Sequence, residues 1–303
     1  YGSGVPSLAV WAPTALKDPG VSVNVYDAAG TKIATKAMTL DETSGVWSVT
    51  GEAGWDRKFY TISLRVYSYA TNSIVNNEVT DPYSVSLATD SVRSQFVNLN
   101  DADLKPAGWD ALAKPPLAAP EDIVLYELHV RDFSIADASV PAEHRGKFTA
   151  FDLPGTTGRN HLEALADAGL THVHILPAFD FATVKENPAD QVNLDDKVEK
   201  LCAKNSAAAS LCATDAGKTI RQAMQDAVAA NQLDRPAQIT DWMRDLDGFN
   251  WGYDPLHFGA PEGSYATNAN GEARILEFRR MVKGLNDLGL RTVMDVVYNH
   301  TNA

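Results

Sequence analysis

The sequence lacks any apolar run close to the roughly 20 residues that a membrane-spanning helix needs. Positive charge is also scarce, because 26 Lys and Arg residues stand against 39 Asp and Glu residues and the formal net charge is −13. Phosphate binding needs clustered Lys and Arg, and the chain shows no basic stripe. These absences disfavour a transmembrane segment and a nucleic-acid partner, and they are compatible with a neutral ligand.

Cysteine is nearly absent, since only Cys202 and Cys212 occur, in the polar, Ala/Ser-rich stretch LCAKNSAAASLC that we predict to be a loop. A metal site is disfavoured because no nearby His or second Cys pair completes it. A local disulfide in an oxidising compartment is the better interpretation, and two unrelated thiols are the alternative. The start, YGSGVPSLAV, shows no signal peptide, but a processed secreted protein would look the same.

The 303 residues are enough for two domains. Residues 1–104 contain short segments such as VSVNVY and FYTISLRVYSY, in which β-branched or aromatic residues alternate with others between turn residues. This pattern predicts an antiparallel β-sandwich, with Trp11 and Trp47 in its core. Residues 105–120 are rich in Pro and Ala, which favours an extended linker.

Residues 121–303 follow a different pattern, in which apolar segments alternate with segments of helical periodicity. The predicted strands are 123–130, 171–179 and 290–297, and the predicted helices are 159–168 and 272–289. Near-continuous apolar strands of this kind are covered on both faces. The alternation predicts a parallel sheet, in an open α/β fold or in the first part of a (β/α)₈ barrel. A long insertion, 180–271, follows the second strand, at the end where both folds bind ligands.

Polar residues end the third strand, in DVVYNH (295–300). A buried strand that turns into Tyr-Asn-His has left the core, so Asp295, Asn299 and His300 are candidate site residues, and an Asn-His turn that caps the next element is the alternative. In GFNWGYDPLH (248–257), Trp251 and Tyr253 flank a glycine beside Asp254. Aromatic rings beside a carboxylate suit a sugar, and an aromatic plug over the sheet end is the alternative.

Two further groups of residues carry weaker signals. VLYELHVRDFS (124–134) ends its strand in His129, Arg131 and Asp132, for which a local Arg–Asp pair is the simpler explanation. His172 and His174 alternate along the second strand, and core or rim positions are favoured over a metal site.

In chain order, YELHVRDFS, GLTHVHILPAFDF, NWGYDP and DVVYNH resemble the α-amylase clan, the family 13 glycoside hydrolases, and within it the type I pullulanases. DVVYNH matches the first signature region of the clan. NWGYDP is similar to the YNWGYDP stretch typical of pullulanases, with Phe249 in place of the first Tyr. VWAPTA (10–15) resembles the opening of a starch-binding-type sandwich module, so the resemblance covers nearly the whole chain, as the N-terminal part of such an enzyme.

The resemblance implies retaining hydrolysis of α-1,6-glucosidic bonds in pullulan, amylopectin and limit dextrins. It implies that Tyr253 stacks under the sugar at the cleavage subsite, that His300 hydrogen-bonds that sugar, and that Asp295 supports both, while Asn299 shapes the turn. The nucleophile and the acid/base belong to the fourth and fifth barrel strands of the family. We therefore expect no catalytic carboxylate in this chain, which we expect to be a fragment or one piece of a nicked chain and inactive alone.

Other expectations complete the interpretation. The resemblance implies an extracellular, secreted or cell-surface bacterial enzyme that works without a cofactor, with calcium as an optional ion whose ligands no spacing specifies. Its partners would be the α-glucan substrate and the remainder of the same polypeptide or a complementary fragment. The alternatives are an isoamylase or limit-dextrinase relative, and a non-catalytic glucan-binding protein that uses the sandwich and the aromatic residues.

Overall fold

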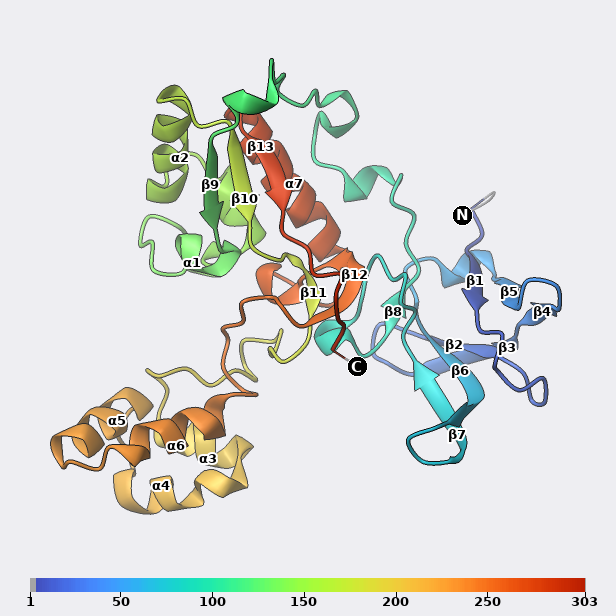
Figure 1. The fold of residues 1–303 in the computed structure, drawn as a ribbon, viewed down its shortest axis with the longest axis horizontal. Helices are drawn as coiled ribbons and strands as arrows, with labels where there is room; N and C mark the ends of the chain where they lie inside the picture. Colours follow the sequence, from blue (N-terminus) through green and yellow to red (C-terminus); the bar gives the residue numbers. More distant parts are fainter. Residues whose placement is uncertain (1–3, 303) are drawn as a thin grey trace. The chain divides into compact units, whose positions relative to one another are not determined.

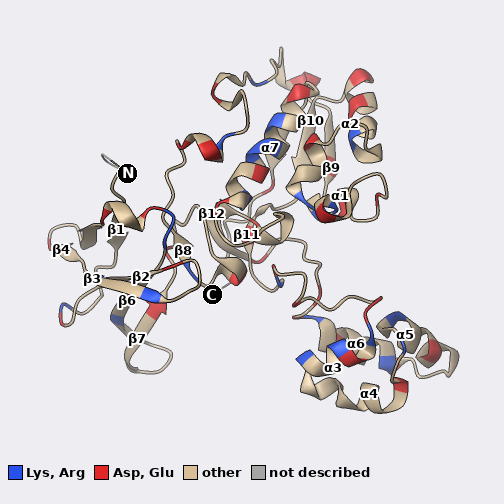
Figure 2. Cartoon of the chain, turned by 180° about the vertical axis from the view of Figure 1, so that it is seen from behind, with Lys and Arg blue, Asp and Glu red and all other residues tan. Residues whose placement is uncertain are grey.

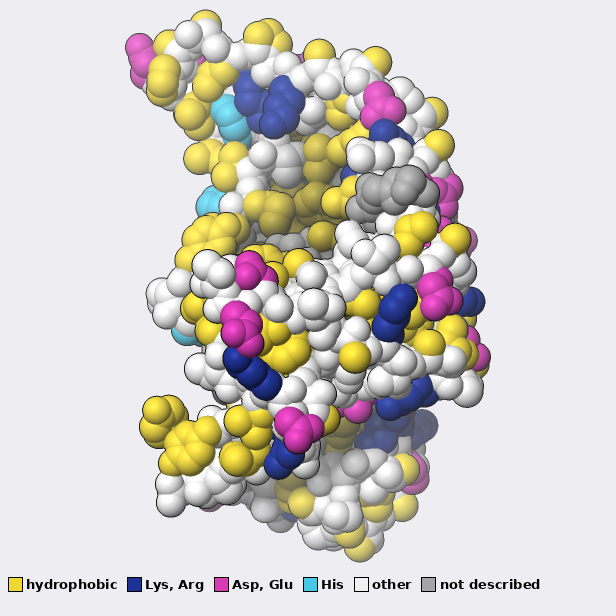
Figure 3. Space-filling view, turned by 90° about the vertical axis from the view of Figure 1, so that its right-hand side faces the viewer, with side chains coloured by type: hydrophobic (Ala, Val, Ile, Leu, Met, Phe, Trp, Pro, Cys, Tyr) yellow, Lys and Arg dark blue, Asp and Glu magenta, His cyan; other side chains and the backbone are white. Residues whose placement is uncertain are grey.

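The computed structural model describes residues 4–302 and divides the chain into two compact units. The first unit comprises the chain up to Phe181 together with the residues from Gly252 onward, and the second comprises Ala182–Trp251. No helix among the described residues is both long enough and apolar enough to pass through a bilayer. Lys, Arg, Asp and Glu are scattered over the elements (Figure 2), and the face in Figure 3 mixes both signs with apolar side chains.

Two antiparallel sheets form the beginning of the first unit, as the alternating pattern predicts. One sheet has the order β1-β5-β4 and the other has the order β3-β2-β6-β7, with β8 also paired to β6. The strands are β1 (Ser7–Trp11), β2 (Ser22–Tyr26), β3 (Lys32–Ala37), β4 (Thr39–Asp41), β5 (Val46–Thr50), β6 (Phe59–Ser68), β7 (Ser73–Val79) and β8 (Ser94–Gln95). Leu8 and Trp47 of the first sheet share one apolar core with Val23 and Ile62 of the second.

The two sandwich tryptophans differ in their environment. Trp47 is buried, as predicted, but the prediction for Trp11 is wrong, because its side chain is 71% exposed. Side chains alternate between the two faces of a strand. Leu8 and Val10 of β1 face the core, so Trp11 points to the other side, where its indole N–H donates to the Ser44 carbonyl at 3.0 Å.

Short 3₁₀ turns lead from the sandwich to the rest of the first unit. Leu104 at the end of η3 (Ala102–Leu104) packs against Ile275, and Arg279 donates to the Leu104 carbonyl at 2.8 Å. The remaining 3₁₀ turns are η1 (Ala53–Trp55), η2 (Thr89–Ser91), η4 (Trp109–Ala111), η5 (Pro120–Asp122), η6 (Ala142–His144), η7 (Phe148–Asp152), η8 (Ser206–Ala208) and η9 (Gly263–Tyr265).

A three-stranded parallel sheet follows, in the order β13-β10-β9. Its strands are β9 (Leu125–Leu128), β10 (His172–Ile175) and β13 (Arg291–Met294), and the helices of this part are α1 (Val130–Ser134), α2 (Thr157–Asp167) and α7 (Ala273–Asp287). Gly169 and Gly289 follow α2 and α7 with φ of +108° and +78°, the left-handed conformation that ends a helix. All three strands point toward the same edge, where β11 (Phe179–Phe181) and β12 (Pro255–Pro261) lie (Figure 1).

The prediction that the first of these strands is covered on both faces is wrong. The strand is shorter than predicted, and Ile123, Val124 and Leu125 are 41%, 51% and 51% exposed. The physical reason is position in the sheet, because β9 pairs only with β10 among the described residues. The apolar side chains at the start of this strand are therefore exposed on the surface of this chain.

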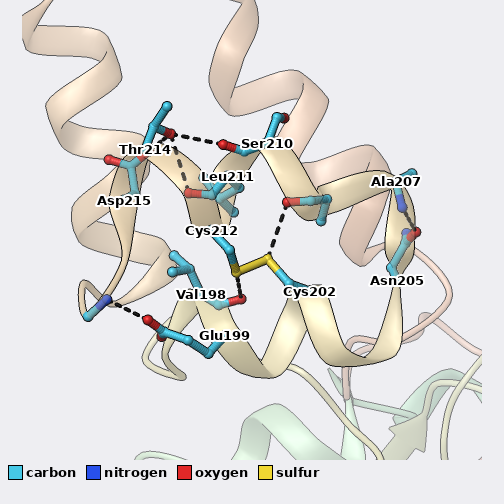
Figure 4. Close-up of a disulfide and its surroundings, with 12 residues drawn as sticks. Val198, Glu199, Cys202, Asn205, Ala207, Ser210, Leu211, Cys212, Thr214 and Asp215 are labelled. Atoms are coloured by element: carbon cyan, nitrogen blue, oxygen red, sulfur yellow. Dashed lines mark hydrogen bonds between the residues drawn. A yellow bond between two sulfur atoms is a disulfide. The ribbon is translucent and has the colours of Figure 1, made fainter.

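The second unit is a set of short helices with its own core. They are α3 (Val198–Lys204), α4 (Ala209–Asp215), α5 (Ile220–Ala229) and α6 (Asp234–Met243). The loop predicted around the cysteines is therefore wrong: Cys202 lies in α3 and Cys212 in α4. Buried Leu201 and Leu211 anchor these helices in the core, and Ala208 of η8, between them in the chain, is buried as well. A disulfide joins Cys202 and Cys212 across the two helices (Figure 4).

Candidate functional site

Residues from two distant segments meet at the carboxyl edge of the parallel sheet. Asp295 follows β13, and its backbone N–H donates to the Ile175 carbonyl of β10 at 2.9 Å. Tyr253 lies just before β12, and its hydroxyl donates to Asp295 Oδ2 at 2.6 Å. His300 Nε2 lies 2.8 Å from the Tyr253 carbonyl oxygen. The structure thus brings Tyr253 together with Asp295 and His300, which lie 42 and 47 positions later in the sequence.

The Tyr253 hydroxyl is held in its neutral, donating form. Burial, the hydrogen bond to Asp295 and the negative charges of Asp295 and Glu127 raise the pKa of Tyr253 to about 12. A phenol that donates to a carboxylate resists ionisation because the phenolate would repel it. The Tyr253 side chain is still 40% exposed, so its ring combines a fixed hydroxyl with a surface that a ligand can reach.

A glycine requirement explains how Tyr253 reaches this position. Gly252 has a φ of +87°, and a Cβ added there would lie 2.8 Å from the Pro177 carbonyl oxygen. Only glycine fits such a close approach in the left-handed region. On the other side of Tyr253, Pro255 pairs with Phe181 in the β11–β12 ladder, and its carbonyl accepts the Asn302 N–H at 2.9 Å. Both flanks of Tyr253 are therefore fixed.

The carboxylate of Asp295 is engaged rather than free. Its Oδ2 accepts the Tyr253 hydroxyl. A retaining glycosidase needs two carboxyl groups about 5–5.5 Å apart, one as nucleophile and one as acid/base. The bond to Tyr253 gives Asp295 a different, orienting role. The arrangement here orients an aromatic ring and an imidazole. It presents an aromatic face beside side chains that can form hydrogen bonds.

Comparison with known proteins shows a match along the whole chain. The pullulanase of Klebsiella aerogenes is 40% identical over 99% of this chain. The crystal structure of PulA from Klebsiella oxytoca, 39% identical, superposes over 100% of the chain with a TM-score of 0.90. The maltotriose complex of PulA from Klebsiella pneumoniae, also 39% identical, covers 98% of it with a TM-score of 0.88. The chain matches the N-terminal region of known pullulanases.

This chain spans less than a third of the length of the pullulanase compared in sequence, and a third or less of the crystallised ones. It covers 28% of the length of the Klebsiella aerogenes pullulanase and 29% and 33% of the two crystallised chains. Residues 181–249 match the family described as the Pullulanase Ins domain, and this range nearly coincides with the second compact unit, 182–251. The long insertion that the sequence suggests is thus a module that other pullulanases share.

The remaining predicted site residues occupy varied positions. Asn299 is exposed, next to Tyr298, whose ring packs on Phe258 at a centroid distance of 5.5 Å. Asp254 is partly buried. Trp251 belongs to the second unit, is 61% exposed and forms an edge contact with Phe249 at 6.1 Å.

The weaker candidates have local partners. Arg131 donates to its neighbour Asp132 at 3.3 Å, and His129 accepts the Asp132 N–H at the start of α1. His172 is buried, and burial together with nearby Arg291 lowers its pKa. His174 Nδ1 lies 3.3 Å from Glu127. These are the core and rim positions that the sequence favours.

Sequence reasoning missed a buried polar cluster that includes Asp180, His257 and Arg274. Asp180 and Arg274 are fully buried, and His257 is 3% exposed. A signal was present, because Asp180 interrupts an apolar run between two phenylalanines and Arg274 sits beside the apolar positions of α7. A charged residue in such a place has partners inside the protein, but one sequence does not say which.

Proposed function

We propose that the complete protein to which this chain belongs hydrolyses α-1,6-glucosidic bonds in pullulan and branched α-glucans with retention of configuration. The observation that carries the proposal is the contact of Tyr253 with Asp295 and His300, formed by the two motifs that resemble those of pullulanases. The crystallised maltotriose complex of a relative supports an α-glucan ligand.

In this proposal the chain supplies substrate positioning. The Tyr253 ring forms the floor of the subsite, Asp295 fixes that ring through the hydroxyl, and His300 hydrogen-bonds the sugar. Asp254 and Trp251 add contacts, and the nucleophile and acid/base come from later strands outside this chain. Positioning is effective in catalysis because a reaction within a well-oriented complex avoids a large entropic cost.

We propose a sandwich module, a linker and part of a barrel as the architecture of this chain. Residues 1–104 form a starch-binding-type sandwich module, 105–120 the linker, and 121–303 the first part of a (β/α)₈ barrel with its insertion. The alternation of parallel strands and helices in the order β9, α2, β10, α7 and β13 supports this architecture. The chemistry needs no cofactor, and calcium has no assigned ligands. The disulfide supports a secreted or cell-surface enzyme.

The test is an assay of the full-length protein on pullulan, with reducing ends as the readout and the anomeric form of the first product followed by NMR. Release of the α-anomer supports a retaining pullulanase. Cleavage of amylopectin without cleavage of pullulan would make the protein an isoamylase-type enzyme. Binding of pullulan with no release of reducing ends would make it a glucan-binding protein.

A further inference from the structure

A buried carboxylate in β11 connects the sandwich to β12, the strand that begins just after Tyr253. Asp180 is fully buried, and its Oδ2 lies 2.7 Å from His257 Nδ1. Its Oδ1 accepts the Ser91 hydroxyl at 2.5 Å and lies 3.5 Å from an Arg274 guanidinium nitrogen. On the other side of the imidazole, His257 Nε2 lies 2.7 Å from the Thr80 hydroxyl oxygen. The pair of Asp180 and His257 is thus clamped by two hydroxyls.

The two hydroxyls and the pair belong to different parts of the first unit. Thr80 and Ser91 lie between β7 and β8, on a connection between two strands of the sandwich. Asp180 and His257 face each other in the β11–β12 ladder. Since β12 begins at Pro255, two residues after Tyr253, this ladder fixes the backbone that presents the Tyr253 ring.

The backbone between β7 and β8 has an unusual conformation where it makes this contact. Ser91 has a φ of +54° and its neighbour Asp90 a φ of +55°, which are unfavourable for residues with side chains. Such conformations persist when surrounding interactions determine them, and the hydrogen bond from Ser91 to the buried carboxylate is one of these. The same connection is held nearby, because the Gly271 N–H donates to the Leu87 carbonyl at 2.9 Å.

A buried carboxylate makes these bonds strong. Hydrogen bonds to a charged acceptor are shorter and roughly twice as strong as neutral ones. His257 Nδ1 faces the Asp180 carboxylate and Nε2 faces the Thr80 hydroxyl, so each ring nitrogen has a polar partner. Hydrogen bonds at both ring nitrogens fix the orientation of the His257 imidazole. Apolar packing alone would not fix this orientation.

We propose that Thr80 and Ser91 are positioning residues for the substrate site, which they hold through Asp180 and His257 and the ladder that presents Tyr253. The sandwich then contributes to the geometry of the cleavage subsite, and not only to attachment of the protein to the glucan. This inference rests on the proposed function of Tyr253. If the two hydroxyls position the site, their loss lowers activity through Tyr253. If they only stabilise the fold, their loss has no effect that depends on Tyr253.

A double-mutant cycle in the full-length protein tests this claim. Thr80→Val and Ser91→Ala should each lower kcat/KM on pullulan by roughly three- to tenfold, the range expected from one hydrogen bond, whereas Thr80→Ser should keep wild-type activity. In a Tyr253→Ala background the same changes should have little further effect, because residues that act through one another are not additive. Equal losses in both backgrounds would overturn the proposal.

Two further variants separate positioning from folding. Ser63→Ala is the matched control, because the Ser63 hydroxyl accepts from Asn24 Nδ2 at 2.7 Å inside the sandwich, so we expect lower stability with unchanged kcat/KM. Ser91→Gly removes the hydroxyl but relieves the left-handed backbone, so it should fold and still lose activity. Wild-type activity of folded Ser91→Gly would contradict the proposal.

A readout without catalysis distinguishes this inference from the proposed function. Hydrogen–deuterium exchange of peptides that span Tyr253 and Asp295 should become faster in Ser91→Gly and stay unchanged in Ser63→Ala. If the wild-type protein cleaves no pullulan, the proposed function fails and the exchange measurement alone decides the positioning. Unchanged exchange in Ser91→Gly would then refute it.

Discussion

Replacing Tyr253 with Phe removes one hydroxyl and keeps the ring. That hydroxyl donates to Asp295 Oδ2 at 2.6 Å, and a hydrogen bond to a charged group contributes about 1.5–3 kcal/mol. Because the Tyr253 side chain is 40% exposed, solvent screening reduces this to about 1–1.5 kcal/mol. At 1.36 kcal/mol for each factor of ten, Tyr253→Phe should lower kcat/KM on pullulan by about five- to tenfold.

Tyr253→Ala removes the ring as well and should lose more activity. Aromatic stacking contributes about 0.5–1.5 kcal/mol beyond burial, which brings the expected loss to about 10- to 100-fold. The assay is release of reducing ends by the full-length protein, with thermal unfolding as the check that each variant folds. Wild-type hydrolysis by a folded Ala variant would refute the assignment, and equal losses for Phe and Ala would show that the ring has no role of its own.

The ionisation of Tyr253 gives a third measurement on the same contact. Its pKa of about 12 lies above the ordinary value of 10, so the fold favours the protonated phenol. Its contribution to stability is therefore complete below about pH 10 and is lost as the pH rises through about 12. A stopped-flow pH jump, recorded as the difference between wild type and Tyr253→Phe, should show no phenolate from this residue at pH 10.5. Half-ionisation near pH 10 would contradict the hydrogen bond.

Three other predictions concern the rest of the chain. Non-reducing peptide mapping should find Cys202 and Cys212 joined, and their replacement by Ser should lower the free energy of unfolding by roughly 2–3 kcal/mol for so short a loop; two alkylatable thiols would refute the bridge. Trp47→Ala should lower the free energy of unfolding by about 3–5 kcal/mol in denaturant unfolding, because the side chain is buried. Trp11→Ala should lower it by less than about 1 kcal/mol, because that side chain is exposed. Similar losses for the two variants would contradict these two environments. The purified chain alone should release no reducing ends from pullulan, since it offers no matched nucleophile and acid; robust turnover by the monodisperse chain would show that this reasoning is wrong.

The sequence by itself determined the elements and the motifs. Alternation at every second residue marks the sandwich strands, and helical periodicity with a closing glycine marks α2 and α7, because these signals arise from local geometry. The polar residues that end the third strand made Asp295 and His300 candidate site residues, and the aromatic turn before β12 made Tyr253 another.

Only the tertiary structure decided which of these residues touch and which face a strand presents. The contact between Tyr253 and Asp295 joins segments 42 positions apart, and no local pattern encodes it. The exposure of Trp11 depends on which side of β1 meets the second sheet, and the helices around Cys202 depend on a core built from four segments. Asp180 bonds the Ser91 hydroxyl, 89 positions away, and its partner His257 bonds the Thr80 hydroxyl, 177 positions away. A buried charge is stable only with partners in three dimensions, so its partners become visible only when the chain is folded.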